Sequence, residues 1–298
     1  MAQAGSTRGA TAAAARGEPA PLPLPLAAAA RDALAGLRWV LTDLDDTLTT
    51  GGRLTAAAYA ALERLAAAGI AVVPVTGRPA GWCDLIARLW PVAAVVGENG
   101  ALWYAHDPAT RRMRRHHAQD AAARAAGRAR LEALAARALA EVPGSAMAAD
   151  QPFRLFDLAV DFREDAGPLG LDAATRIAET FREGGAEAKL SSIHVNAWIG
   201  GWDKLSGLRH LFAALWAPLE GAAMLGRVAY LGDSPNDAPL FAALPLSVGV
   251  ANVRPFLPAM PAAPAYVTEH EAGAGFAEFA DAVLAARDAL DARGGGAG

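Results

Sequence analysis

The sequence predicts an α/β protein in which a doubly wound parallel sheet is interrupted by an inserted α+β domain. Short apolar runs alternate with helical segments near both ends of the chain, as do the strands and crossover helices of a parallel sheet. Between residues 101 and 197 this alternation stops, and longer helices flank strand-like segments. We therefore expect an insertion within the sheet domain, and not a second domain after it.

The first half of the sheet is expected over residues 39–96. Apolar runs at 39–41, 70–75 and 92–96 predict three strands. The segment 55–68 predicts a helix that ends at Gly69, because glycine commonly terminates helices. Pro79 opens the next helix, since its fixed backbone angle suits the first helical turn. Strands separated by helices in this order predict parallel pairing.

The insertion and the second half of the sheet follow. Helices are predicted at 120–141, 171–183 and 203–216, and strands at 153–162, 191–197, 228–231 and 246–250. We expect a disordered Ala/Pro-rich tail over residues 1–36, a core domain formed by 37–101 and 198–292, and an inserted domain over 102–197.

Composition excludes several kinds of partner. The net charge of −4 gives no general basic footprint for nucleic acid, and the basic run at 111–117 is expected to be a solvated turn. No apolar stretch reaches the roughly 18 residues of a membrane span, so we expect no membrane partner. The lone Cys83 cannot form a disulfide within the chain, which favours a reducing compartment and a cytoplasmic location.

Polar clusters end three of the predicted strands. Asp43 and Asp45 follow the run at 39–41, Thr76 follows 70–75, and Asp233 and Asp237 follow 228–231. The carboxyl ends of parallel strands share one edge of the sheet, where ligands bind. Carboxylates gathered there repel one another, and a hard divalent cation relieves that repulsion. Oxygen-only ligands predict Mg²⁺.

A cation, carboxylates, a hydroxyl and a lysine together suit phosphoryl transfer. A carboxylate can attack phosphorus, while a cation and an ammonium group neutralise the charge on the phosphoryl oxygens. A second carboxylate can act as general acid and base. Lys204 is the candidate lysine, because it starts a helix just before the strand that carries Asp233. A solvent-exposed role for Lys204 remains the alternative.

With these residues placed, the chain resembles the haloacid dehalogenase superfamily of phosphohydrolases, which have a Rossmann-like core. Four motifs occur in the superfamily's order: Asp43-Leu44-Asp45-Asp46-Thr47, Thr76-Gly77-Arg78, Lys204, and Gly232-Asp233-Ser234-Pro235-Asn236-Asp237. The resemblance implies that Asp43 is the nucleophile and Asp45 the acid/base. It also implies that Thr76 holds the phosphoryl group and that Lys204 bridges this group to Asp43.

The same resemblance implies the metal ligands and the subclass. Mg²⁺ would be bound by Asp43, the backbone carbonyl of Asp45 and Asp233, with Asp237 as ligand or support. The segment between Asp45 and Thr76 has room for only one turn and one helix, so a cap domain fits only between Thr76 and Lys204. Together with the Gly97-Glu98-Asn99-Gly100 turn, this resembles subclass IIB (Cof-type), which includes sugar-phosphate phosphatases. Leu205 departs from the glycine that often follows the lysine, and Asp46 departs from another frequent glycine.

Candidate substrate contacts flank these motifs. Gly77 and Arg78 adjoin Thr76, and Arg78 could meet an anionic group or brace the following turn. On the strand predicted at 191–197, His194 and Asn196 share one face. That polar face either lines the cleft or faces solvent.

The function implied is a magnesium-dependent phosphatase that hydrolyses a small phosphorylated metabolite, expected to be a sugar phosphate, through an aspartyl phosphate. A phosphosugar mutase on the same scaffold and a silent phosphosugar-binding protein are the alternatives. We expect a small-molecule partner only, and a monomer or homodimer.

Overall fold

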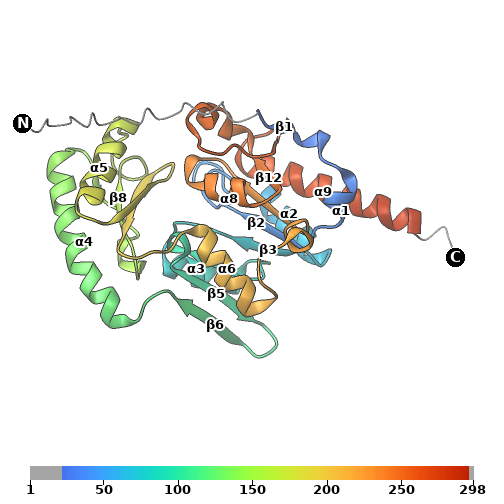
Figure 1. The fold of residues 1–298 in the computed structure, drawn as a ribbon, viewed down its shortest axis with the longest axis horizontal. Helices are drawn as coiled ribbons and strands as arrows, with labels where there is room; N and C mark the ends of the chain where they lie inside the picture. Colours follow the sequence, from blue (N-terminus) through green and yellow to red (C-terminus); the bar gives the residue numbers. More distant parts are fainter. Residues whose placement is uncertain (1–21, 295–298) are drawn as a thin grey trace, which may run out of the picture.

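The computed structural model describes residues 22–294 and has the predicted α/β architecture (Figure 1). Its main sheet is six-stranded and parallel throughout. In spatial order the strands are β1 (Leu24–Pro25), β13 (Tyr266–Val267), β12 (Leu246–Gly249), β11 (Val228–Gly232), β2 (Trp39–Thr42) and β3 (Ala71–Pro74). The predicted fold class is thus confirmed.

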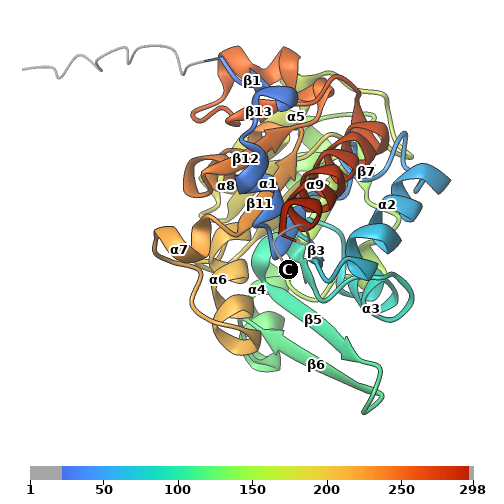
Figure 2. The same cartoon turned by 90° about the vertical axis from the view of Figure 1, so that its right-hand side faces the viewer.

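Alternating side chains on each strand supply the two faces of this sheet. Val40 packs in one hydrophobic cluster and its neighbour Leu41 in the other, because successive strand residues point to opposite faces. Helices cover both faces (Figures 1 and 2). One face packs against α1 (Arg31–Ala35), α2 (Ala56–Ala67), α3 (Ala80–Leu89) and α9 (Ala272–Gly294), and the other against α6 (Lys204–Leu215) and α8 (Ala238–Ala243). The short helix α7 (Ala222–Leu225) precedes β11.

A second, three-stranded sheet corrects one predicted boundary. It contains β4 (Val95–Gly97), β5 (Leu102–Asp107) and β6 (Arg112–His117), and a parallel bridge between Val75 and Val96 joins it to the main sheet. The hairpin β5–β6 therefore extends the core, although it was expected to begin the insertion. The basic run is likewise mostly strand β6, not a turn, because its residues pair with β5.

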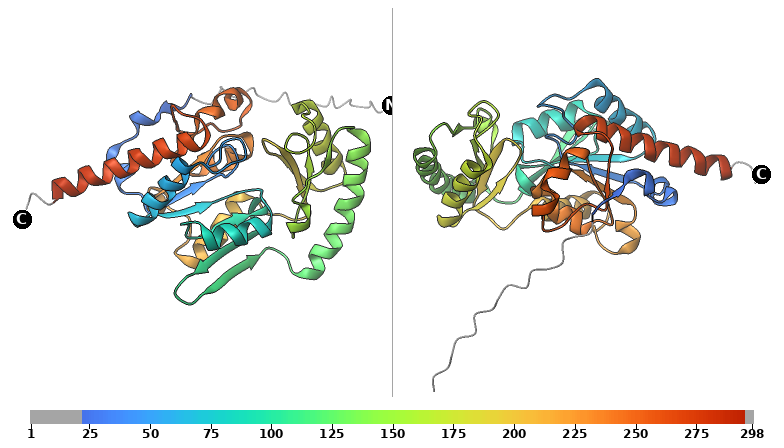
Figure 3. Two further views of the ribbon diagram at one scale, coloured as in Figure 1. Left: turned by 180° about the vertical axis from the view of Figure 1, so that it is seen from behind. Right: turned by 90° about the horizontal axis from the view of Figure 1, so that it is seen from above.

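The insertion, which we call the cap, runs from α4 (Ala121–Glu141) to β10 (His194–Trp198). Its sheet has the order β7 (Ala146–Met147), β8 (Leu158–Asp161), β10 and β9 (Glu187–Leu190), and α4 and α5 (Leu171–Glu183) pack on it. Figure 3 shows the cap beside the main sheet. Only the end of the predicted strand 153–162 is extended, because Pro152 lies in the 3₁₀ turn η3 (Gln151–Phe153).

The predicted tail is shorter than expected. Residues 1–21 lie outside the described residues, but 22–36 are part of the core. There Leu24 pairs with Tyr266, and the buried Leu26 and Leu34 pack with the sheet's first face. The sequence of residues 22–36 has no regular alternation of apolar and polar residues, so it did not predict this role.

Four 3₁₀ segments lie in the core, namely η1 (Leu26–Ala28), η2 (Glu98–Gly100), η4 (Pro235–Asp237) and η5 (Ala251–Ala259). Within residues 22–294 no helix has the length and apolarity needed to cross a membrane.

Candidate active site

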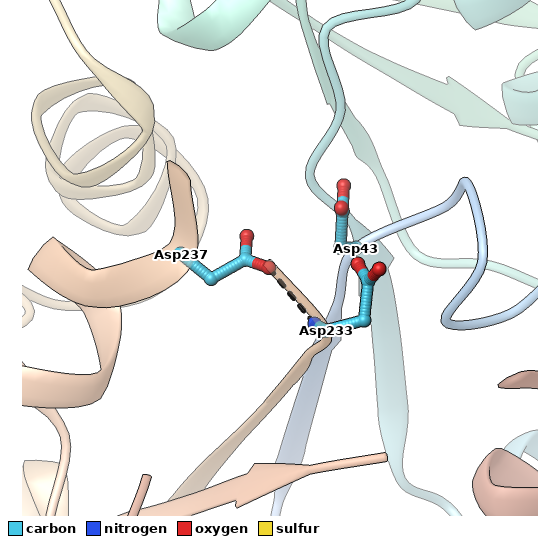
Figure 4. Close-up of side chains that lie close together, drawn as sticks. All are labelled: Asp43, Asp233 and Asp237. Atoms are coloured by element: carbon cyan, nitrogen blue, oxygen red, sulfur yellow. Dashed lines mark hydrogen bonds between the residues drawn. The ribbon is translucent and has the colours of Figure 1, made fainter. Parts of the chain in front are cut away.

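Parallel pairing brings the acidic strand ends together. Leu231 of β11 is in register with Thr42 of β2, so Asp233 and Asp43 leave neighbouring strands at the same edge. Asp237 follows in η4, and one oxygen of each of these three aspartates lies within 4.8 Å of the others. All three are buried. Figure 4 shows the carboxylates of Asp43 and Asp233 close together, with Asp237 bonded to the Asp233 backbone.

Lys204 enters this cluster from the first turn of α6. Its Nζ lies 3.0 Å from Asp43 Oδ1 and 2.8 Å from Asp237 Oδ1, and the side chain is buried. The helix starts there because Asp203 and Ser206 form a capping box. A solvent-exposed role for Lys204 is therefore wrong.

Burial and mutual repulsion set the electrostatics of the cluster. Burial, with the charges of Asp237 and Asp45, raises the pKa of Asp43 to about 7, against the opposing effect of Lys204. Burial and the charges of Asp237 and Asp43 hold the pKa of Asp233 well above its ordinary range. A divalent cation between Asp43 and Asp233 would favour both carboxylates, and their oxygen donors fit Mg²⁺.

Asp237 differs from the other two because its hydrogen-bonding capacity is used. Oδ1 accepts from Lys204 Nζ and from Tyr230 Oη (2.5 Å), and Oδ2 accepts from the backbone N–H groups of Asp233 and Ser234. Such a carboxylate braces the cluster and leaves no oxygen free for a metal. Of the two roles considered for Asp237, the geometry favours support.

The carboxylate of Asp45 lies outside the group of three aspartates and contacts Arg78. Arg78 Nε lies 3.0 and 3.1 Å from its two oxygens, and Nη2 lies 3.0 Å from Oδ1. Its side chain is therefore not among the grouped metal-binding oxygens. Of the two roles considered for Arg78, contact with anionic groups is the one seen, and these groups belong to the protein.

Thr76 and Gly77 lie beside Asp43. The N–H of Val75 donates to the carbonyl of Thr42, so the residues that follow leave adjacent strands side by side. Thr76 is buried, and its hydroxyl accepts the N–H of Arg78 at 3.0 Å.

A polar cavity joins this site to the cap, and we call it the cap cavity. Asp43, Asp45, Gly77, Arg78, His194 and Asn196 are among its lining residues. Of the two possibilities for the polar face of β10, the geometry favours lining the cleft, because His194 and Asn196 are both buried there. The cavity has a volume of about 20 Å³, which is room for about one water molecule.

Several charged residues of this region were missed from the sequence. They are Glu98 in η2 and Asp150, Arg154, Asp157 and Glu164 in the cap. Arg154 is buried and hydrogen-bonds Asp150 and Asp157, and its Nη1 donates to the Gly77 carbonyl at 2.9 Å. Their spacing gave no signal in the sequence, because a spacing of three or four residues predicts ion pairs only on a helix and Arg154 lies in extended backbone.

Comparison with known proteins agrees with the first two motifs. Residues 40–125 match the family model of haloacid dehalogenase-like hydrolases. This match, together with the fold described above, confirms the resemblance to that superfamily, and the α+β cap placed after the second motif agrees with subclass IIB. No curated protein matches the chain.

Solved structures share the fold at low sequence identity. A Thermoplasma acidophilum protein is 17% identical, with a TM-score of 0.61 over 83% of this chain and 98% of its own. A haloacid dehalogenase-like hydrolase from Bacteroides thetaiotaomicron is 14% identical, with a TM-score of 0.55 over 82% and 98%. The sucrose-phosphatase of Synechocystis, solved with sucrose and phosphate, is 16% identical, with a TM-score of 0.54 over 83% and 97%.

Proposed function

We propose that the protein is a magnesium-dependent phosphatase that hydrolyses a small phosphorylated metabolite through an aspartyl phosphate. One observation carries this proposal. Asp43 stands buried between Lys204 and Asp233, and Asp45 lines the same cavity. One of the solved structures that share the fold is a sucrose-phosphatase, which supports a sugar phosphate as substrate. A cytoplasmic location and a monomeric or homodimeric state are part of the same proposal.

Each residue has a distinct part in the proposed reaction. Lys204 holds Oδ1 of Asp43, which leaves Oδ2 free to attack phosphorus and form the acyl phosphate. As the bond to the leaving oxygen breaks, Asp45 delivers a proton to that oxygen. Asp45 then takes a proton from the water that attacks the acyl phosphate, and inorganic phosphate and Asp43 are released. Bound Mg²⁺ would supply charge neutralisation for the phosphoryl oxygens.

Asp237 and Thr76 take no covalent part in the proposed reaction and position the groups that do. Asp237 and Asp43 both hold Lys204, with Nζ–Oδ1 distances of 2.8 and 3.0 Å. Because the whole cluster is removed from water, these charges act strongly on the transferring group. We propose that Thr76, which follows the neighbouring strand β3, contacts the phosphoryl oxygens.

The first prediction is that Asp43→Asn abolishes turnover and leaves the fold intact. An amide cannot form the acyl phosphate, so release of inorganic phosphate from p-nitrophenyl phosphate and from a sugar-phosphate panel should fall by at least about 10³-fold. Thermal unfolding would report the fold.

Asp172→Asn, which changes an exposed aspartate of α5, is the matched control and should keep full activity. Full activity in Asp43→Asn would exclude the proposed chemistry. Appearance of an isomeric sugar phosphate without free phosphate would instead identify a mutase.

A further inference from the structure

Asp45 lines a second cavity besides the cap cavity. The cap cavity has a volume of about 20 Å³, which is room for about one water molecule. The second cavity, which we call the side groove, has a volume of about 420 Å³, within the usual range of small-molecule sites. Together with Asp45 it is lined by Leu44, Leu54, Trp82, Leu85, Trp90 and Phe153. Of these two cavities, only the side groove has room for an organic group beside Asp45.

The walls of the side groove are apolar. The hydroxyl of Thr49, which also lines it, already donates to the Leu44 carbonyl at 3.1 Å. Among the described residues that line the groove, Asp45 is the one that carries a charge. Trp82 and Leu85 are 39% and 51% exposed, although both are large apolar residues. A carbon ring or chain bound there would remove these side chains from water, which is favourable.

The side groove belongs to the core and not to the contacts between core and cap. Apart from Phe153, which packs against Gly81 at the start of α3, its lining residues are core residues. Arg78 forms ion pairs with Asp150 and Glu164 of the cap, and none of these three is among the described lining residues. A ligand can therefore enter the groove without breaking these ion pairs.

Asp45 connects the side groove to the proposed reaction. It delivers the proton to the leaving oxygen in that reaction, and it lines both the groove and the cap cavity, where Asp43 lies. A phosphoryl group is larger than a water molecule, so the cap must move for this group to reach Asp43. Because the groove is built from core residues, most of its wall stays in place when the cap moves. The leaving group thus has a site beside Asp45 in either position of the cap.

From these observations we propose that the side groove binds the leaving group of the substrate, and that this group is apolar, with a carbon ring or chain beside the ester oxygen. This inference rests on the proposed function. A sugar hydroxyl held against these walls would lose its hydrogen bonds to water and meet apolar side chains, which is costly. A sugar phosphate fits the groove only where the sugar carries an apolar substituent.

The experiment compares two ligands that cannot be hydrolysed. Benzylphosphonate and naphthylmethylphosphonate have a methylene group in place of the ester oxygen and differ by one fused ring, so the phosphonate contribution cancels in the ratio of their affinities. Calorimetry with the unmodified protein and Mg²⁺ measures both affinities. We expect naphthylmethylphosphonate to bind at least about tenfold more tightly, because even one methylene group in an apolar pocket can be worth about tenfold.

A pair of variants on one helix tests whether the groove is responsible. Leu85→Gln should reduce the affinity ratio several-fold, because Leu85 lines the groove from α3. Leu89→Gln is the matched control, because Leu89 is 67% exposed on the same helix and is not among the described lining residues. It should leave the ratio unchanged.

Equal affinities, tighter binding of benzylphosphonate, failure of both ligands to bind, or a ratio that Leu85→Gln leaves unchanged would each overturn the inference. Equal affinities together with sedimentation that shows an unmodified dimer and a Leu85→Gln monomer would assign the groove to an interface between copies. Phosphate release from p-nitrophenyl phosphate tests the proposed function separately. A protein that shows the expected ratio but releases no phosphate would refute that function and leave the ligand preference of the groove standing.

Discussion

The three clustered aspartates at the sheet edge differ in how much hydrogen-bonding capacity each has left. Asp237 has none, because four donors fill its two oxygens, whereas Asp43 Oδ2 accepts from no donor among the described residues. Asp233 receives only the weaker contacts of Thr47 Oγ1 at 3.1 Å and Asn252 Nδ2 at 3.3 Å. One residue type thus serves as brace, nucleophile and metal ligand in our proposal, according to its partners.

We predict that Mg²⁺ stabilises the protein and that Asp233→Asn reduces this effect. Asp43 and Asp233 repel each other in a buried place, so a cation bound only by the folded state should raise the melting temperature by several degrees. At a concentration 100 times the dissociation constant the gain is about 2.7 kcal/mol. Thermal unfolding across a Mg²⁺ titration measures it.

Asp281→Asn, at an exposed ion pair of α9, should keep the full shift. If Mg²⁺ does not change the melting temperature, or if Asp233→Asn shifts as far as the unmodified protein does, then Asp233 does not bind the metal.

The third prediction concerns the stability of the protein in acid and the contribution of Glu164 to it. Its contacts with His194 and Arg78 lower its pKa to about 2 in the folded protein, from an ordinary value of 4.5, so the folded state binds the proton more weakly than the unfolded state. The stabilisation that Glu164 contributes is therefore complete above about pH 4.5 and is lost as the pH falls toward 2. The difference in unfolding free energy between the unmodified protein and Glu164→Gln should shrink over this range. A constant difference from pH 7 to 2 would contradict the assignment.

At the scale of elements, prediction succeeded where a local pattern is sufficient. Apolar runs followed by Asp43 or Asp233 correctly predicted β2 and β11. Thr55 and Asp120 marked the starts of α2 and α4, where their side chains accept backbone N–H groups. It failed where pairing is decided by distant residues. The short strands β1, β7 and β9 carry no clear alternation, and the hairpin β5–β6 joins the core through a bridge between Val75 and Val96.

The candidate site shows the same division. The strand-end aspartates were predictable because the carboxyl ends of parallel strands must meet. Glu164 and Glu98 were not predictable, since each reaches its partners across the boundary between the core and the cap. No pattern around either residue in the sequence specifies such a contact.

The close contact between α6 and η2 positions Lys204, and it gives the fourth prediction. A Cβ added at Gly207 would lie 2.6 Å from Gly100 Cα, so Gly207→Ala must push α6 away from η2. We expect a loss of about 1–3 kcal/mol in unfolding free energy and at least a tenfold fall in kcat, because a shift of 1 Å in a catalytic group can cost about 100-fold.

Gly201→Ala is the matched control, because an added Cβ there meets no atom within 4 Å. At Gly207, within α6, alanine would stabilise the helix by about 1 kcal/mol relative to glycine if no contact opposed it. A gain in stability on Gly207→Ala would therefore show that the contact with Gly100 does not constrain the helix.

At the scale of the whole molecule, Glu98 connects the core and the cap. It belongs to η2 in the core, and its carboxylate accepts the N–H of Ala80 at the start of α3. It also accepts the N–H groups of cap residues Leu155, Phe156 and Asp157, at 2.9, 2.6 and 3.0 Å. Both oxygens are thus filled by backbone donors, and the cap segment that carries Arg154 is held beside Gly77.

The last prediction is that Glu98→Gln loosens the cap from the core. Two of the four backbone donors would then face an amide NH₂ group, which cannot accept them, so buried N–H groups would lose their partners. We expect a loss of about 2–4 kcal/mol in unfolding free energy, together with a higher KM for p-nitrophenyl phosphate, because Arg154 and Asn196 depend on this segment. Glu63→Gln, on the exposed side of α2, should change neither quantity. If Glu98→Gln matched that control in both stability and KM, the cap would be held by its other contacts, chiefly Arg78 with Glu164 and Arg154 with the Gly77 carbonyl.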